Sequence, residues 1–347
     1  MRIQPSKLPR WSWMRRWCSV ALAFLFSLVF GVAAPADASG GIRPSAHGAR
    51  AVLDRNGLIA YVARSHDSAT DARDQDVYAV SLGGEPMQLT DTPELEGGPA
   101  WSPDGSKLAF HRWDDSESSA DIYIMDADGS DLRRLTDHPR NEVGPTWSPN
   151  GRKIAFISDR GPNYASRVFT IASDGSDSRP RKVSNLEVRA LAWSPTDPVL
   201  AVAVDPAGEA RRGIRTLDLR TGRGRWVTPR SRTVWSLAWA PTGDALTYTR
   251  SRRKGNEARI IRLDGSRDRP VPTSGMATPS WGTEIPTWAP DRRSIAYAIF
   301  GSDDDDPYPY DTPFELRVAS MNGERDDVVV TLEAGAFLVD ISWQLLR

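Results

Sequence analysis

A tryptophan followed by a proline-containing turn recurs along this chain at nearly constant spacing. The tryptophans are 46, 46, 46 and 49 residues apart. A period of this size indicates a repeat architecture, in which each unit is one supersecondary structure that packs on its neighbours. The five copies are "WSPDG" (101–105), "WSPNG" (147–151), "WSPTD" (193–197), "WAPTG" (239–243) and "WAPDR" (288–292).

The unit between two tryptophans has the pattern of short β-strands. After "WSPDG" come the apolar run "KLAF" (107–110), the alternating run "DIYIMDADGS" (121–130) and "RRLTD" (133–137). Alternation of period two, broken by Gly, Pro, Asn and Asp about every ten residues, predicts strands rather than helices. Four strands in each unit of this length are typical of a β-propeller blade. Runs equivalent to "KLAF" occur six times, near residues 59, 108, 154, 200, 246 and 295.

The two ends of the repeat region complement each other. The first unit has Val52 where the tryptophan should stand, and "DISWQLL" (340–346) supplies a spare inner strand with Trp343. We therefore predict an all-β fold, a six-bladed propeller of four-stranded antiparallel blades over residues 51–347. Residues 338–346 would complete the first blade, which leaves no open sheet edge in the ring.

The recurring turn motif is predicted to be structural. Proline presets φ, Asp or Asn bonds the local backbone, and glycine takes the positive φ at the end of the turn. Ser102 and Asp104 have the residue types of a catalytic group. Because their equivalents recur around a ring, we expect them to shape turns and Trp101 to fill the space between two blades.

The repeat resembles that of TolB-like propellers, which are periplasmic proteins of bacteria. The resemblance is carried by "LTD", "WSPDG" and "SDRGPNYASRVFTIASDGS" (158–176), and it is strongest over 88–137 and 134–184. It implies a WD40-like propeller fold. TolB itself also has an N-terminal α/β domain. We interpret residues 39–50 of this chain as a linker, so the resemblance covers the propeller only and is weaker support for the specific role of TolB in envelope integrity. Similar propellers also gate prolyl-oligopeptidase-type peptidases.

The first 38 residues have the pattern of a secretory signal peptide. Five basic residues and no acidic one precede the apolar run 18–34, and Ala36-Asp37-Ala38 matches a cleavage site. An uncleaved membrane anchor is the alternative. Cleavage would leave 39 basic and 44 acidic residues and no cysteine, since Cys18 lies in the leader. We expect an exported, periplasmic or secreted monomer whose mature domain does not span a membrane, and this mildly acidic balance argues against nucleic acid as a partner.

Strand parity predicts that one face of the ring carries the variable loops. Links between strands two and three, and between blades, lie on this varied-loop face, and loops on a rigid scaffold are where binding usually occurs. Four acidic residues precede the inner-strand tryptophans by four to six positions and would make a negative channel mouth for a cation or a peptide amine. Alternatively, they are solvated or paired with Arg140 and Arg189. They are Glu96, Glu142, Glu187 and Glu284.

The most unusual loop is "GSDDDDPYPYDTP" (301–313). Its four consecutive carboxylates suggest Ca²⁺ as the one cofactor to consider, although the spacing of a calcium loop is absent and a solvated acidic tip is the simpler interpretation. Tyr308 and Tyr310, set between prolines, suit a stiff contact surface for a partner. The carboxylates are Asp303, Asp304, Asp305 and Asp306.

The sequence contains few residues in patterns that are typical of an active site. His111 and His138 fall near the varied-loop face, but no histidine has metal-ligand spacing and no nucleophile elbow is present. The sequence therefore favours a non-catalytic propeller that binds a protein or peptide partner through the varied-loop face and channel mouth, with His111 and His138 among the candidate binding residues. Two alternatives stay open. One is a glycan-active lyase or hydrolase using His111, His138, Glu142 and Glu284; the other is a stand-alone sensor or gating propeller.

Overall fold

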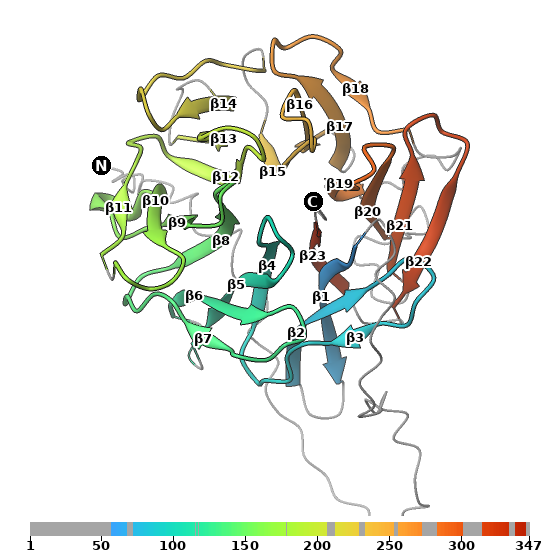
Figure 1. Ribbon diagram of the computed structural model, residues 1–347, viewed down its shortest axis with the longest axis horizontal. Helices are drawn as coiled ribbons and strands as arrows, with labels where there is room; N and C mark the ends of the chain where they lie inside the picture. Colours follow the sequence, from blue (N-terminus) through green and yellow to red (C-terminus); the bar gives the residue numbers. More distant parts are fainter. Residues whose placement is uncertain are drawn as a thin grey trace, which may run out of the picture. The chain divides into compact units, whose positions relative to one another are not determined.

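Six antiparallel sheets form a closed ring of blades around a central axis (Figure 1). The computed structural model describes residues 57–67, 72–114, 116, 118–177, 179–206, 212–228, 233–252, 256–272, 283–300, 314–332 and 337–344. The predicted leader 1–38 and linker 39–50 lie outside these ranges. Among the described residues, no helix has the length and apolar character that a membrane crossing requires.

Blades 1 to 3 are each four-stranded, with the strands named from the inner strand outward. Blade 1 consists of β23 (Phe337–Trp343), β1 (Ile59–Asp67), β2 (Ala72–Val80) and β3 (Met87–Gln88). Blade 2 consists of β4 (Glu96–Trp101), β5 (Lys107–Trp113), β6 (Ala120–Asp126) and β7 (Arg133–Arg134). Blade 3 consists of β8 (Glu142–Trp147), β9 (Lys153–Ser158), β10 (Arg167–Ala172) and β11 (Arg181–Lys182), with the 3₁₀ turn η1 (Pro162–Tyr164) between β9 and β10.

Blades 4 to 6 continue the ring. Blade 4 consists of β12 (Val188–Trp193), β13 (Val199–Val204) and β14 (Gly213–Asp218), and in its described part the fourth strand is reduced to one bridge between Arg215 and Trp226. Blade 5 consists of β15 (Val234–Trp239), β16 (Ala245–Ser251), β17 (Asn256–Arg262) and β18 (Arg269–Pro270). Blade 6 consists of β19 (Thr283–Trp288), β20 (Ser294–Phe300), β21 (Phe314–Ser320) and β22 (Asp326–Thr331).

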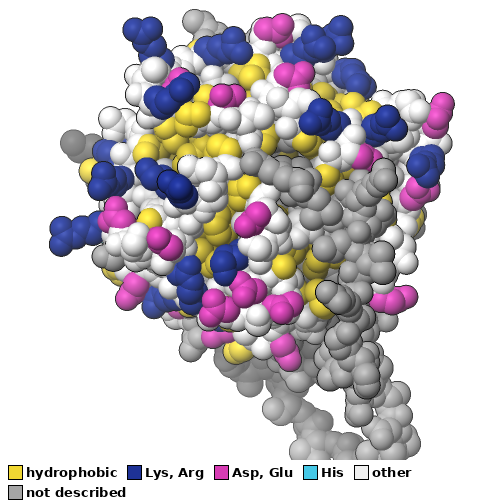
Figure 2. All heavy atoms as spheres, viewed as in Figure 1, with side chains coloured by type: hydrophobic (Ala, Val, Ile, Leu, Met, Phe, Trp, Pro, Cys, Tyr) yellow, Lys and Arg dark blue, Asp and Glu magenta, His cyan; other side chains and the backbone are white. Residues whose placement is uncertain are grey.

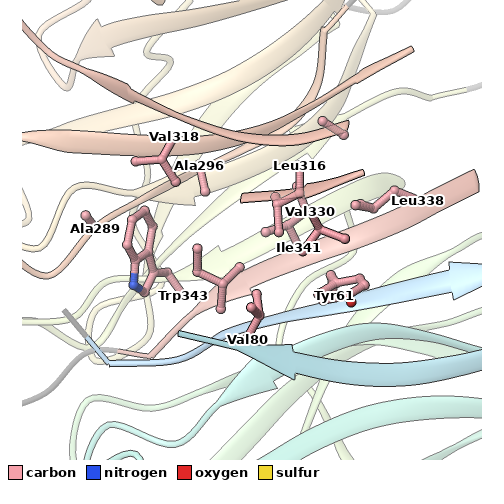
Figure 3. Packing of buried hydrophobic residues seen from close by; sticks show 12 residues of the cluster. Tyr61, Val80, Ala289, Ala296, Leu316, Val318, Val330, Leu338, Ile341 and Trp343 are labelled. Atoms are coloured by element: carbon pink, nitrogen blue, oxygen red, sulfur yellow. The ribbon is translucent and has the colours of Figure 1, made fainter. Parts of the chain in front are cut away.

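The C-terminal strand completes the first blade, as the sequence predicted. β23 pairs antiparallel with β1, and Trp343 lies opposite Ile59 just as Trp101 lies opposite Leu108 in blade 2. Figure 3 shows Ile341 and Trp343 packed between Tyr61 of blade 1 and the side chains of blade 6. Gln344 strengthens the closure because its side chain accepts from Leu58 N and donates to the carbonyl of Gly105 at 2.6 Å.

The repeated tryptophans fill the spaces between blades. Trp101 of blade 2 packs on Ala60 and Val77 of blade 1 and is only 7% exposed. The indole N–H of Trp147 donates to the carbonyl of Ala100 in the preceding blade at 2.9 Å, and Trp239 makes the same bond to Ala192. A buried tryptophan removes some 200 Å² from water, so each contributes roughly 4 kcal/mol or more to the seam between two blades.

The Ser-Pro-Asp-Gly segments are turns, which confirms the structural interpretation of the motif. Ser102 Oγ donates to Asp104 at 2.6 Å and accepts from Lys107 N at 2.9 Å, and Gly105 has a φ of 70°. Ser148 and Asn150 repeat the arrangement in blade 3. The hydrogen bonds from Ser102 and Ser106 lower the pKa of Asp104. These groups are engaged within the turn and mark the face opposite the varied loops.

Several strands run further into the varied loops than predicted. β1 and β2 form a hairpin in which Asp67 pairs with Ala72, so much of the predicted loop 64–75 is strand. β5 likewise continues through His111 and Arg112 to Trp113. Consequently His111 lies on a strand inside the sheet, and the predicted loop 111–120 is a shorter connection.

Candidate functional site on the varied-loop face

Each inner strand carries a bulge near the varied-loop face, and the bulges are of two kinds. In blades 2 and 3 the irregularity includes Gly98-Pro99 and Gly144-Pro145, where both glycines have φ of 61°. In blades 4 and 5 a single residue, Arg189 or Trp235, is left without an opposite residue on the second strand. Because a bulge redirects the side chain that it carries, these two residues are aimed differently from their neighbours.

Glu96 is fully buried in the seam between blades 1 and 2. Its carboxylate accepts from Arg112 Nη2 at 2.7 Å and Nε at 2.9 Å, and from the hydroxyls of Thr90 and Thr92. Burial raises the pKa of Glu96, while the bonds to Thr90 and Arg112 act in the opposite direction. The Arg112 guanidinium also lies 4.7 Å from the ring centre of Tyr123. Glu96 is thus held inside the seam, and a role in binding stays a prediction.

Glu142 occupies the same position in blade 3 and is also fully buried. It forms an ion pair with Arg160, which in turn lies 4.8 Å from the ring centre of Phe169. His138 belongs to the same cluster: its backbone N–H donates to Asp121 at 3.1 Å, and desolvation together with Arg160 lowers the pKa of its imidazole. The structure therefore brings His138 and Glu142 together around one arginine.

His111 of β5 is packed against two glycines of the inner strand of its own blade. A Cβ added at Gly97 would come within 2.6 Å of the imidazole, and one added at Gly98 within 2.9 Å. Asp340 of β23 lies at the same place and accepts from Gly98 N at 2.8 Å. Burial lowers the pKa of His111 to about 4. The five equivalent positions in the other blades hold small or apolar residues: Val62, Ile157, Ala203, Thr249 and Ala298.

The other predicted site residues are spread around the ring. Glu187 is half-buried, and its carbonyl accepts from Asp205 N. Glu284 pairs with Ala298 on β20, and its side chain is outside what the structure describes. The acidic loop lies outside the described residues too, so the structure says nothing of its calcium or contact roles. Among the described residues, no group of three or more His, Cys, Asp or Glu side chains could hold a metal ion. The acidic-loop residues are Asp303, Asp304, Asp305, Asp306, Tyr308 and Tyr310.

Two exposed aromatic residues on the varied-loop face are each stacked on an arginine. Tyr164 in η1 is 63% exposed, and the Arg140 guanidinium lies 4.0 Å from its ring centre. Trp235 in β15 is 43% exposed, with Arg189 of blade 4 at 4.3 Å. Aromatic residues and arginine are the side chains enriched at protein–protein contacts. Figure 2 shows one face of the ring, where Lys and Arg side chains are spread around the rim with Asp and Glu between them.

Trp235 and Tyr164 were not among the residues predicted from the sequence. Trp235 had a detectable signal, because a second tryptophan four residues before the repeated Trp239 is a departure from the repeat. Tyr164 had none, since its exposure depends on the backbone of the turn, in which Asn163 and Tyr164 both have positive φ.

Comparison with known proteins agrees with this geometry. The family model of the TolB β-propeller domain matches residues 59–285. A search of curated protein sequences gave no match. TolB from Acinetobacter baumannii is structurally similar, with a TM-score of 0.64 and 18% identity over 82% of this chain and 67% of that one. A putative TolB from Agrobacterium tumefaciens has a TM-score of 0.59 and 15% identity over 83% and 99% of the two chains.

The same fold also occurs well outside that family. A chain of the nidogen/laminin complex has a TM-score of 0.60 and 12% identity, covering 84% of this chain and all of that one. At such identities the structural likeness shows the fold alone, and the family is shown by the match to its model over most of the repeat region. Together with six blades built on the Trp-Ser-Pro-Asp-Gly repeat, this match shows that the chain belongs to the TolB β-propeller domain family.

Proposed function

We propose that this protein is a non-catalytic propeller that binds a protein or peptide partner through its varied-loop face and channel mouth. The observation that carries the proposal is the pair of exposed aromatic residues on that face, each stacked on an arginine: Tyr164 on Arg140, and Trp235 on Arg189. Exposed, pre-positioned aromatic rings lose little conformational entropy when a partner covers them.

The placement of the acidic residues favours binding over catalysis. A glycan-cleaving site built on Glu142 and His138 would need a carboxyl group free to exchange a proton with substrate. Glu142 instead is fully buried and paired with Arg160. His111, the other histidine suspected of catalysis, is packed against Gly97 and Gly98, and burial lowers its pKa to about 4.

We also propose that the protein acts after export, in the periplasm or outside the cell. The support is the basic, then apolar, then small-residue pattern of residues 1–38. N-terminal sequencing of the protein recovered from a periplasmic fraction would test this. A mature chain that begins at Ser39 is the expected result; an intact Met1 on a protein that stays with the membrane fraction would favour the anchor.

Site-specific photo-crosslinking in the native host tests the binding function. A photoreactive amino acid would be placed at Tyr164 or Trp235, and at Asp128 and Arg220 on the opposite face as matched exposed controls. We expect one discrete crosslinked species from the two varied-loop positions and none from the controls. Equal labelling from both faces, or labelling only at Asp128 and Arg220, would overturn the proposal.

A further inference from the structure

We propose that blades 4 and 5 carry a docking site for an acidic segment of the partner protein. This inference rests on the proposed function and specifies the chemistry of the partner. The site is a chain of touching residues on the varied-loop face, which we call the arginine arc. It consists of Arg189, Asp205, Arg212, Trp235, Ser251, Arg252 and Glu257.

The two bulges place the centre of the arc. Arg189 in β12 and Trp235 in β15 are the extra residues of their strands, and they lie at the same distance from the repeated tryptophans of adjacent blades. The equivalent position in blades 2 and 3 holds Gly97 and Val143, which pair normally with the second strand. The side chains turned out by the bulges in blades 4 and 5 meet each other, with 4.3 Å between guanidinium carbon and indole centre.

Contacts continue from this pair into the loops of both blades. Toward blade 4, Arg189 is ion-paired with Asp205, which also binds Arg212 at 2.9 Å. Toward blade 5, the indole N–H of Trp235 donates to the hydroxyl of Ser251. The next residue, Arg252, is paired with Glu257 at 2.8 Å. The arc is therefore a connected, pre-organised surface rather than a set of separate side chains.

Positive charge exceeds negative charge along the arc. Asp205 is shared by two arginines, and Glu257 by three, namely Arg250, Arg252 and Arg259, the last of which also binds Asp268. The side chains of Arg212 and Arg252 are 42% and 50% exposed. Because a shared carboxylate can satisfy only part of the donors around it, N–H groups of the two exposed guanidiniums are left to bind carboxylates of a partner.

The surroundings of the arc favour a short acidic protein segment over a long polyanion. Elsewhere on the varied-loop face the side chains of Asp91, Asp114 and Asp137 are exposed. A uniform polyanion crossing the ring would meet this repulsion, whereas a local acidic stretch would not. The exposed part of the Trp235 indole supplies the apolar contact that a peptide needs beside its carboxylates.

An array of synthetic peptides tests the inference without knowledge of the natural partner. The probes are 12-residue peptides with four Glu among varied apolar positions, beside matched peptides with Gln or Lys in place of Glu. We expect binding to the Glu peptides that falls about tenfold or more in Arg212→Glu/Arg252→Glu. Trp235→Ala should also weaken binding while Trp235→Phe retains most of it, and Arg152→Glu/Arg220→Glu on the opposite face is the control with equal charge change.

Three results would overturn the inference. One is equal binding to the Glu and Gln peptides; another is full binding by Arg212→Glu/Arg252→Glu; the third is tighter binding to polygalacturonate or polyphosphate than to any peptide. Correct folding of each variant is verified by an unchanged thermal transition.

If photo-crosslinking still captures a discrete partner at Tyr164 while the Glu peptides fail to bind, the docking site is wrong and the proposed function stands. If both fail, the proposed function falls as well.

Discussion

The inner strands of blades 2 and 3 and those of blades 4 and 5 follow the same repeat but place their charged residues differently. Five residues before the repeated tryptophan, blades 2 and 3 have Glu96 and Glu142, both fully buried with an arginine, whereas blades 4 and 5 have the buried apolar residues Val188 and Val234. At the next position, four residues before the tryptophan, it is blades 4 and 5 that carry the polar or aromatic residue. There blades 4 and 5 present Arg189 and Trp235 on bulges.

This difference shows how one repeat can provide both a rigid ring and a binding surface. Where the ion pair is inside the seam, it ties an inner strand to its neighbours and its charge is neutralised. Where valine fills the seam, Arg212 and Arg252 lie at the rim and keep exposed donors, although blade 5 also buries the Arg250–Glu257 pair. The blade architecture is the same in both sectors, so the division follows from a few side chains at equivalent positions and from the kind of bulge that carries them.

The largest expected effect on stability concerns the buried ion pair between Glu96 and Arg112 in blade 2. Arg112→Ala leaves the Glu96 carboxylate buried without its ion-pair partner, and we expect the free energy of unfolding to fall by about 3–5 kcal/mol. Urea denaturation followed by tryptophan fluorescence would measure it. The repeat supplies a matched control, because Glu96→Val/Arg112→Val copies the Val188–Val204 pair of blade 4 and should stay within about 1–2 kcal/mol of the native protein. A loss below about 1 kcal/mol for Arg112→Ala would show that the seam does not depend on this pair.

An effect of intermediate size is the dependence of stability on pH that His111 should cause. Its folded pKa of about 4 lies below the unfolded value of about 6.5. Between these values the unfolded chain takes up a proton that the folded chain excludes, so stability is full above about pH 6.5 and declines toward pH 4. We expect about 1–3 kcal/mol, discounted because the ring is partly exposed.

The His111→Val variant copies the residue at the equivalent position of blade 1 and should remove this pH dependence. Comparing urea midpoints of the two proteins from pH 7 to pH 4 isolates His111 from the other histidines. Asp340 faces the same position, so Asp340→Asn is the companion variant, and it should leave a slope from His111. An unchanged slope in His111→Val would contradict the account.

The smallest expected effect on stability is in the arginine arc. Arg212→Ala and Arg252→Ala remove exposed partners of shared carboxylates, and exposed ion pairs contribute little, so each should change the free energy of unfolding by less than about 1 kcal/mol. The same urea assay applies. A loss comparable to that of Arg112→Ala would mean that the arc holds the ring together, and the contrast between the two sectors would be wrong.

Most of the fold could be predicted because the repeat fixes it. The tryptophan spacing indicated the blade period, Trp343 indicated the closing strand, and the turn residues indicated the orientation of the faces. The fourth strand of blade 4 departs from the pattern, since in its described part only Arg215 and Trp226 form a bridge. The loop lengths were less predictable, because polar residues such as Ser65 and Arg73 continue a hairpin whose partners are local.

The candidate site was less predictable because the bulges change which side of the inner strand a given residue faces. Counting backward from the tryptophan treated Glu96, Glu142, Glu187 and Glu284 as one ring. In the structure Glu96 and Glu142 share one register position, whereas Glu187 lies one residue further from its tryptophan and Glu284 one residue closer. A one-residue bulge reverses which side a strand residue faces. Only the three-dimensional pairing shows that Arg189 and Trp235 are the bulged residues.

The division between the two sectors is tested most directly by measuring stability and peptide binding on the same two variants. Arg112→Ala, at a temperature where it remains folded, should lose several kcal/mol of unfolding free energy and keep the native affinity for the Glu peptides. Arg212→Glu/Arg252→Glu should keep stability to within about 1 kcal/mol and lose about tenfold or more in affinity. The account is contradicted if both variants lose both properties, or if the arc variant binds the Glu peptides as tightly as the native protein.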